Sequence, residues 1–391
     1  MKIKRYLTII LILVSLLISG CEILLLKEAP ITITIWHPFE KLKAEGVQFA
    51  VDSYMELNPM VTIAVQKVPF DQLLYTYQDA VANDQGPNIF IGADDWGPEL
   101  DIADLILPLT GVNIEELNQA SIATGLYLGY QIGVPYSLEG VILYRNSSLQ
   151  PESASSYTDL VEKANAVSSG DTYGAILEVG HLYSLAHLNA IGGLLMTNEG
   201  LPAFNSPEAV QWIDMLIEFT EMGADTWYGD NDLAKFKAGE AGWIIDGTWN
   251  YTDIYGALGD DLEIDLWPEG MSGYVMADMI YLNPNSSTAE SKVSKEFIQY
   301  LIGSDSQTAS SLFDPNFIPV NMTVEPTNTN IKAIMEALSG GVSWIAKPEM
   351  DAYWGPMETA ILAVLDDGTE PLIALQLALD LVNAAIGSQG E

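Results

Sequence analysis

Basic residues and cysteines are scarce in this chain of 391 residues. Fifteen lysines and arginines stand against 53 aspartates and glutamates, which gives a formal net charge of −38. Nucleic-acid binding draws most of its affinity from Lys and Arg on phosphates, so this balance argues strongly against a nucleic-acid partner. Charged residues are only 17% of the chain, below the usual quarter, so the chain is poor in bases rather than crowded with acids. Such a surface suits an exported protein in an acidic or salty medium.

The single cysteine, Cys21, excludes an intrachain disulfide, and its position gives it another meaning. A basic start at residues 2–5 precedes an apolar run at residues 7–18, which is too short to span a membrane comfortably. Small residues then precede Cys21, an order that resembles a lipoprotein signal peptide. We therefore expect residues 1–20 to be removed, Cys21 to be lipidated, and residues 21–30 to tether the protein to the outer face of the cytoplasmic membrane. An uncleaved N-terminal anchor is the alternative, and it also places the globular part outside the cytoplasm.

Patterns typical of catalytic or metal sites are mostly missing. The histidines His37, His181 and His187 lack the spacing of metal ligands, and a surface or core role is the better interpretation of each. The sequence contains neither a G-x-S-x-G elbow nor a Walker-type phosphate loop. A carboxylate pair such as Asp95 and Glu139 would suit a glycosidase, but an acid-rich chain is expected to show some such pair by chance. We therefore predict no catalytic residue, no metal and no cofactor.

The chain is nevertheless apolar enough to fold. A hydrophobic content of 49% excludes a disordered chain, and 391 residues suffice for two domains with full cores. Predicted strands at residues 31–36, 61–68 and 88–92 alternate with predicted helices at residues 43–57 and 71–82. This β-α-β-α-β order predicts a parallel sheet in an α/β fold, with ligands at the carboxyl ends of its strands.

A similar alternation restarts in the second half of the chain. Ser206 and Pro207 form a good signal for the start of a long helix. We further expect a helix at residues 114–128, a strand at residues 173–177, an extended segment at residues 274–282, and a turn at residues 353–356, where Gly and Pro follow a tryptophan.

Glu139 is unusual because it lies within a stretch, residues 133–144, that otherwise reads as a buried strand. An unpaired buried carboxylate is costly, so two interpretations are open. Glu139 faces water from an edge strand with Gly140 at a bulge. Alternatively, the strand crosses from one domain to another and exposes the carboxylate in a cleft.

Tryptophans recur beside turn residues. Trp96 and Trp354 each precede a Gly-Pro pair, Trp249 follows Gly247 by two residues, and an aspartate or a tyrosine lies shortly before each tryptophan. Flat rings beside carboxylates suit a sugar, because its C–H faces pack on indole while its hydroxyls donate to acids. A loop anchor that packs on its own domain is the equally open alternative for each of them.

Six ordered segments resemble the maltose/maltodextrin-type extracellular solute-binding proteins (family 1) of ABC sugar importers. The segments are ITITIW, NDQGPNIFIGADDWGPEL, IGVPYSLEGVILYRNSSL, FNSPEAVQWIDMLIEF, FKAGEAGWIIDGTWNYTDI and AYWGPMETAI, and the resemblance runs from about residue 31 to residue 386. It implies a two-lobe periplasmic-binding-protein fold of type II, in which each lobe is a mostly parallel sheet with flanking helices and three hinge crossings join the lobes. The implied N-terminal lobe is residues 31–138 plus 276–314, and the implied C-terminal lobe is residues 141–273 plus 320–391. The hinges fall near residues 138–141, 274–279 and 314–320, which favours the crossing-strand interpretation of Glu139.

The resemblance also implies a set of sugar contacts, which are acids, a base and stacking aromatics. These positions fall on Glu40, Lys41, Asp95, Glu139, Tyr183, Trp249 and Trp354, with the register of Tyr183 uncertain. This chain departs from a maltose binder of the family at three positions: Gly92 replaces a Trp, Trp96 replaces an Arg, and Trp344 replaces a Met. A polar, stacking glycan site is therefore implied, including Trp96 and Trp344, while maltose itself is not.

The implied partners are an oligosaccharide and the transmembrane subunits of an ABC permease, and a monomer is expected. A binder of the same fold for a polyol or a phosphorylated ligand is the alternative. A phosphorylated ligand would call for arginine, and Arg145 is the only arginine beyond the signal segment.

Overall fold

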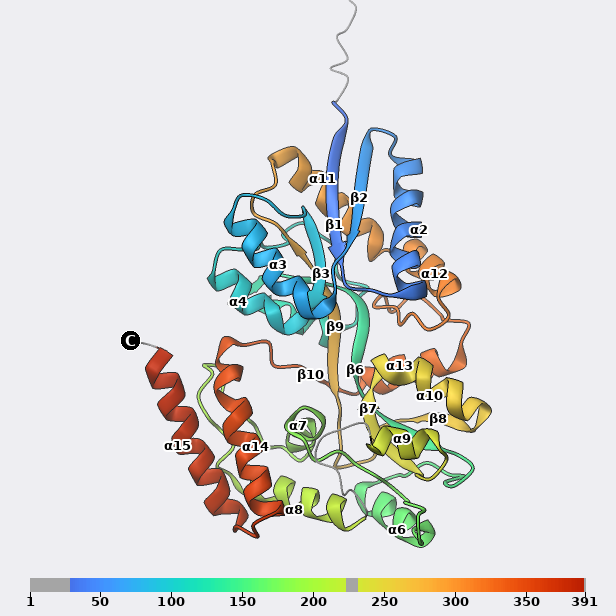
Figure 1. Ribbon diagram of the computed structural model, residues 1–391, viewed down its shortest axis with the longest axis vertical. Helices are drawn as coiled ribbons and strands as arrows, with labels where there is room; N and C mark the ends of the chain where they lie inside the picture. The colour runs from blue at the N-terminus through green and yellow to red at the C-terminus, as the bar shows by residue number, and fades with distance from the viewer. Residues whose placement is uncertain (1–28, 223–230, 390–391) are drawn as a thin grey trace, which may run out of the picture.

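The computed structural model describes residues 29–222 and 231–389, so the predicted signal segment and Cys21 lie outside the described residues. The described chain forms two lobes that are joined by long strands (Figure 1). We call the lobe that holds strands β1 (Ile31–His37), β2 (Val61–Lys67) and β3 (Ile89–Ala93) the N-terminal lobe, and the lobe that holds β7 (Trp243–Gly247) and β8 (Leu262–Asp265) the C-terminal lobe. Within the described ranges, no helix is long and apolar enough to cross a membrane.

The N-terminal lobe follows the predicted β-α-β-α-β order. Its parallel strands lie in the order β2-β1-β3, and β1 pairs residue for residue with β2 along its whole length. Alternating β-branched residues place Ile33 and Ile35 in the core. The strands are β1 (Ile31–His37), β2 (Val61–Lys67) and β3 (Ile89–Ala93), and the helices are α2 (Lys41–Leu57), α3 (Phe70–Ala82), α4 (Gly97–Ile102), α5 (Gln119–Thr124), α11 (Thr288–Leu301) and α12 (Ser304–Phe313), with a 3-10 turn η1 (Asp94–Trp96).

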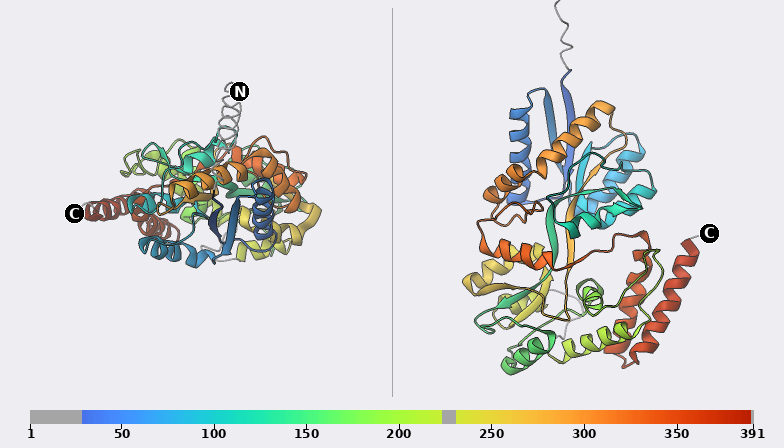
Figure 2. Two further views of the ribbon diagram at one scale, coloured as in Figure 1. Left: turned by 90° about the horizontal axis from the view of Figure 1, so that it is seen from above. Right: turned by 180° about the vertical axis from the view of Figure 1, so that it is seen from behind.

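Two long strands, β6 (Val134–Asn146) and β9 (Tyr274–Leu282), run from one lobe into the other (Figures 1 and 2). They pair with each other in antiparallel fashion, and β9 also pairs with β3 while β6 continues along β7 and β8. The two lobes therefore share one eight-stranded sheet, in which six strands lie in the order β2-β1-β3-β9-β6-β7, while β8 pairs with β6 and β10 (Val342–Ser343) pairs with β9. Every residue of β6 is buried except Glu139, so the crossing-strand interpretation is the correct one.

A third segment meets the two strands at the same place. The backbone N–H of Leu138 donates to the carbonyl of Ile318 at 3.0 Å, and Ser137 forms an isolated bridge with Pro319. Gly140 is required there, because a Cβ atom at this position would lie 2.4 Å from the carbonyl oxygen of Tyr274. Three chain segments thus converge beside Glu139, where the resemblance implies the hinge; the exact lobe boundaries stay a prediction.

The C-terminal lobe surrounds the lower half of the crossing strands with helices. Its interior holds large, fully buried side chains such as Trp212, Trp243 and Tyr353. Ser206 caps α8 by accepting a hydrogen bond from the N–H of Ala209, as its sequence signal predicts. The strands are β7 (Trp243–Gly247), β8 (Leu262–Asp265) and β10 (Val342–Ser343); the helices are α6 (Tyr157–Val167), α7 (His181–Ala190), α8 (Pro207–Glu221), α9 (Asn231–Lys237), α10 (Tyr251–Leu258), α13 (Thr329–Ser339), α14 (Asp351–Leu365) and α15 (Pro371–Gln389); the 3-10 turns are η2 (Thr248–Asn250), η3 (Gly259–Asp261) and η4 (Pro348–Met350).

Three local predictions are wrong in detail. The helix expected at residues 114–128 is only the short α5, because Asn118 caps its start and Gly125 follows its end; a small hairpin of β4 (Leu126–Tyr127) and β5 (Tyr130–Gln131) comes next. Residues 173–177 form no strand: Tyr173 makes an isolated bridge to Ala241, and Ile176 makes one to Ile244 of β7. Residues 353–356 form no turn: they lie within α14, where buried neighbours such as Tyr353 and Met357 hold the helix across Pro356.

Candidate functional site

Glu139 is held by a lysine of the N-terminal lobe. The ammonium of Lys43, on the first turns of α2, lies 2.8 Å from Glu139 Oε1 and 2.5 Å from Asp278 Oδ2. Glu139 belongs to β6 and Asp278 to β9, so one ammonium binds a carboxylate from each crossing strand. The two acidic side chains are only 20% and 15% exposed. Burial alone would lower the pKa of Lys43, but the Asp278 and Glu139 carboxylates outweigh burial and raise it above its usual value.

The other oxygen of Glu139 is bound by the C-terminal lobe. The hydroxyl of Thr248, in η2 just after β7, donates to Glu139 Oε2 at 2.5 Å and accepts from the N–H of Gly140 at 3.1 Å. Asp278 also accepts a hydrogen bond from the Ser137 hydroxyl at 2.5 Å. Residues of both lobes and of both crossing strands therefore form one polar network, which we call the hinge network: Lys43, Ser137, Glu139, Thr248 and Asp278.

Each lobe places a tryptophan on a 3-10 turn directly after a strand. Trp96 follows β3, and its indole lies over Gly92, where a Cβ atom would come within 2.4 Å of the ring. Trp249 follows β7 in the same way and lies over Gly247. Trp96 packs on Phe70 and is partly buried, whereas Trp249 is 47% exposed. The glycines thus make room for the rings, and Trp249 presents more free surface to a ligand than Trp96.

The acids that precede Trp96 carry perturbed pKa values. Asp94 is buried and accepts a hydrogen bond at 3.1 Å from the N–H of Ala277 in β9. Burial, joined by the Asp95 carboxylate, raises the pKa of Asp94 to about 8. Although Asp95 is an exposed residue, desolvation of its carboxyl group and the nearby charges of Asp351 and Glu99 raise its pKa to about 6. Asp351 begins α14 in the C-terminal lobe, so the two lobes approach each other at this point.

A chain of neighbouring aromatic rings lies in the C-terminal lobe and includes Trp354 of α14. Neighbouring ring centroids lie 4.8 Å apart for Tyr274 and Trp344, 5.7 Å for Trp344 and Trp354, and 4.9 Å for Trp354 and His181. The Tyr274 hydroxyl, Trp344 Nε1 and both ring nitrogens of His181 are buried and have no hydrogen-bond partner within the described residues. Buried polar atoms are normally satisfied, so a ligand or water is the natural partner here. Tyr183, on the first turn of α7, follows His181 by two residues.

Glu40 and Lys41 lie at the edge of the N-terminal lobe. Both are exposed, and Glu40 forms an ion pair with Lys67. Lys41 begins α2 with a φ of +47°, a left-handed conformation that non-glycine residues seldom adopt. Such strained positions cluster at functional sites, and the conformation of Lys41 fits a ligand-contact role.

The predicted site residues therefore lie in separate places, with Glu40 and Lys41 at the edge of the N-terminal lobe. Glu139 and Trp249 lie at the hinge network, Trp344, Trp354 and, by position, Tyr183 lie around α14 and α7, and Asp95 and Trp96 share the turn η1 of the N-terminal lobe. Lys43, Asp278 and Thr248 were missed by sequence reasoning. Asp278 carries the same signal as Glu139, a carboxylate inside a predicted strand, and that signal could have found it.

The histidines are core residues, as predicted. His37, His181 and His187 are buried, and burial lowers their pKa values to about 4, 3 and 3. His37 Nδ1 accepts from the N–H of Phe39, and His187 Nδ1 accepts from the N–H of Ser272. Across residues 29–222 and 231–389, no group of three or more His, Cys, Asp or Glu side chains is arranged to hold a metal ion.

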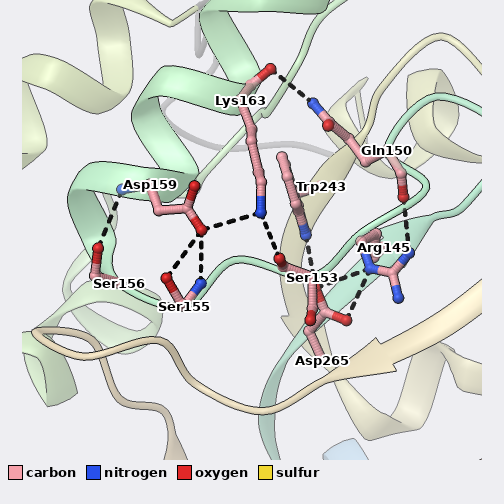
Figure 3. A network of polar contacts seen from close by, with 9 residues as sticks. All are labelled: Arg145, Gln150, Ser153, Ser155, Ser156, Asp159, Lys163, Trp243 and Asp265. Atoms are coloured by element: carbon pink, nitrogen blue, oxygen red, sulfur yellow. Dashed lines mark hydrogen bonds and ion pairs between the residues drawn. The ribbon is translucent and has the colours of Figure 1, made fainter.

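Arg145 is occupied inside the C-terminal lobe (Figure 3). Its Nε donates to both carboxylate oxygens of Asp265, at 2.8 and 3.0 Å, and its Nη1 donates to the carbonyl of Gln150 at 2.7 Å. The Trp243 indole N–H binds the same Asp265 carboxylate at 2.9 Å. A buried and paired guanidinium of this kind is a structural element of β6 and β8, which argues against a role in holding a phosphorylated ligand.

Comparison with known proteins gives consistent results. A family model described as bacterial extracellular solute-binding protein matches residues 50–337. The maltotriose-binding protein of Pyrococcus abyssi (strain GE5 / Orsay) is 23% identical over 359 residues, which are 86% of this chain and 78% of that protein.

Solved structures share the fold. A cyclo/maltodextrin-binding protein complexed with maltotetraose has a TM-score of 0.85 at 20% identity, over 92% of this chain and 98% of that one. An extracellular solute-binding protein of Staphylococcus aureus in complex with maltose has a TM-score of 0.84 at 19% identity, over 93% and 100% of the two chains. At such identities the similarity shows the fold, and the predicted two-lobe α/β fold is confirmed. In the C-terminal lobe, however, β6 pairs in antiparallel fashion with β7 and β8, where a mostly parallel sheet was expected.

Proposed function

Since the chain belongs to the bacterial extracellular solute-binding proteins, which act outside the cytoplasm, we propose that it captures a maltodextrin-like oligosaccharide between its lobes. It delivers this ligand to the transmembrane subunits of an ABC importer. Similar proteins that bind maltotriose, maltotetraose and maltose support the choice of ligand class.

The observation that carries the proposal is the approach of the two lobes at α14. Asp95 of the N-terminal lobe lies near Asp351, and Trp354 follows Asp351 on the same helix. A sugar ring stacked on the Trp354 indole presents its hydroxyls to such carboxylates. From the family resemblance we assign Glu40, Lys41, Asp95, Trp96, Glu139, Tyr183, Trp249, Trp344 and Trp354 to the ligand site, and of these Asp95 and Trp354 lie on the elements that meet at α14.

Binding without catalysis fits the state of Glu139. A glycosidase needs one carboxyl group free to donate a proton and a second one free to attack or to activate water. Both oxygens of Glu139 are engaged, one with Lys43 and one with Thr248. The protein therefore holds and releases its ligand unchanged.

Calorimetric titration tests this proposal directly. Maltotriose and maltotetraose should bind, whereas sorbitol and a sugar phosphate should not, and the wild-type protein should leave maltotetraose intact over hours. A ligand at 100 times its dissociation constant should also raise the unfolding free energy by about 2.7 kcal/mol. Binding of the polyol or the sugar phosphate in place of the oligosaccharides overturns the assignment, and release of shorter sugars reveals a glycosidase.

We also propose that lipidated Cys21 anchors a monomeric protein to the membrane. The basic and apolar segments before Cys21 support the anchor. Cys21→Ser should release the protein from the membrane fraction into the medium, as immunoblots of both fractions will show. Ser19→Ala, in the same segment, serves as the control and should stay with the membrane; a native protein whose mass includes Met1 contradicts the anchor.

A further inference from the structure

We propose that Lys43 is a positioning residue, one that sets the arrangement of the two lobes through the hinge network and thereby the affinity for oligosaccharide. This inference rests on the proposed function for its ligand, but the contacts that carry it do not involve the ligand. The sequence offers no hint of the role, because Lys43 reads as an ordinary charge on the first turn of a helix.

The first step of the argument is the position of the ammonium. Asp278 sits on the part of β9 that pairs with Ala93 of the N-terminal lobe, whereas Glu139 sits where β6 enters the C-terminal lobe. Lys43 binds both, and its ammonium also lies 4.6 Å from the centre of the Phe39 ring. A single cation on α2 thus fixes the two crossing strands relative to the N-terminal lobe.

The second step is the connection to the C-terminal lobe. Thr248 holds the far oxygen of Glu139 and the N–H of Gly140, and Trp249 is the next residue along the chain. A shift of Glu139 therefore moves or releases the turn that carries Trp249. Lys43 acts on this turn through Glu139, without touching it.

The third step is what the loss of the cation does. In a variant without Lys43, the partly buried Glu139 and Asp278 carboxylates lose the ammonium that they share and have no positive charge between them. Removing one partner of a buried charge pair is costly mainly because the other charge stays behind. The carboxylates separate or take up a proton, and either response loosens the strand crossing.

The test compares Lys43→Met with Lys292→Met in the full-length protein. Both variants remove one positive charge, but Lys292 is 71% exposed on α11 and has only a loose pair with Glu296 at 3.6 Å. Hydrogen–deuterium exchange without ligand should accelerate over β6, β9 and the Thr248 turn in Lys43→Met alone. The affinity of Lys43→Met for maltotriose or maltotetraose should fall about tenfold or more relative to the wild type.

Two further variants separate positioning from simple destabilisation. Lys43→Arg keeps the cation and should recover most of the affinity and the exchange protection. Thr248→Val should weaken binding, and the double variant with Lys43→Met should lose less than the product of the two single losses, because both act through Glu139.

The outcomes keep this inference distinct from the proposed function. If the wild-type protein binds no oligosaccharide, the proposed function fails, while faster exchange in Lys43→Met still supports the positioning role. If the wild-type protein binds but Lys43→Met matches Lys292→Met in both exchange and affinity, the positioning role is overturned.

Discussion

Glu139 and Asp278 show that a charged residue within an apolar strand can mark a functional contact. Each is a carboxylate within a run of strand-forming residues, and each proves to be half of an ion-pair arrangement around Lys43. The carboxylates are visible in the sequence because their strands are otherwise apolar. Lys43 is not visible, because a lysine on a helix is ordinary and its partners lie 96 and 235 residues away.

Trp249, which is exposed, and Trp354, which is partly buried, give the first prediction. Trp249→Ala and Trp354→Ala should each weaken oligosaccharide binding by about 2 kcal/mol or more, roughly thirtyfold in dissociation constant, because each removes a stacking surface. Calorimetric titration measures the change. Tyr75→Ala is the matched control, since Tyr75 is 72% exposed on α3 and should leave binding unchanged. If both Trp variants bind as the wild type does, the rings are loop anchors.

Glu178 gives a prediction about pH. Burial, followed by the charges of Asp232, Asp246 and Glu358, raises the pKa of Glu178 to about 9, against a usual value of 4.5. Between these two values the folded protein holds more protons than the unfolded chain, so this carboxyl makes the unfolding free energy fall as pH rises. Asp94 also makes the unfolding free energy fall as pH rises, up to its pKa of about 8.

Glu178→Gln tests this reasoning, because glutamine resembles the protonated acid. At pH about 8 the variant should exceed the wild type in unfolding free energy by about 1 kcal/mol or more, and near pH 5 the two should be similar. Urea titrations at both pH values measure the difference. Exposed Glu162→Gln should show no such pH-dependent gain, and a variant less stable at pH 8 than at pH 5 relative to wild type would contradict the assigned protonation.

At the scale of elements, sequence patterns located most strands and helices. They failed where glycines and turn residues decide whether an apolar segment forms a helix or a hairpin. The extended segment expected at residues 274–282 matches β9 to the residue, and the Ser206 cap identified the start of α8. The pattern around residues 114–128 is apolar at helical spacing, but Gly125 and Gly129 divide it into α5 and a hairpin. The site itself was predicted only in part, because the hinge network depends on contacts between distant segments.

The β4–β5 hairpin gives a prediction about its turn. Its two-residue loop, Leu128 and Gly129, has φ values of +47° and +83°, which is the pattern of a type I′ turn. Leucine pays a steric penalty in this conformation, and here its side chain is also 76% exposed. Leu128→Asn should raise the unfolding free energy by about 0.5–1 kcal/mol in urea titrations. Leu126→Asn, at a strand position of the same hairpin, should give no gain; equal effects would show that lost apolar exposure, not the turn, is responsible.

At the scale of the whole molecule, the charge balance predicts a response to salt. A net charge of −38 makes the folded chain repel itself, and ions screen exposed charges beyond about 8 Å at physiological ionic strength. The melting temperature at neutral pH should therefore rise by several degrees between low salt and about 1 M sodium chloride. Calorimetric melting curves at stepwise salt concentrations measure the trend, and a melting temperature that falls with salt contradicts it.

The sheet shared by both lobes has a mechanical consequence. β6 and β9 are hydrogen-bonded to each other from Val134 to Gly140, across the junction of the lobes. Relative motion of the lobes must therefore be a twist distributed over many backbone dihedrals, not a swing about one loose joint. The paired strands have a preferred twist, and their resistance to further twisting, rather than the length of any linker, sets how far the two lobes can separate.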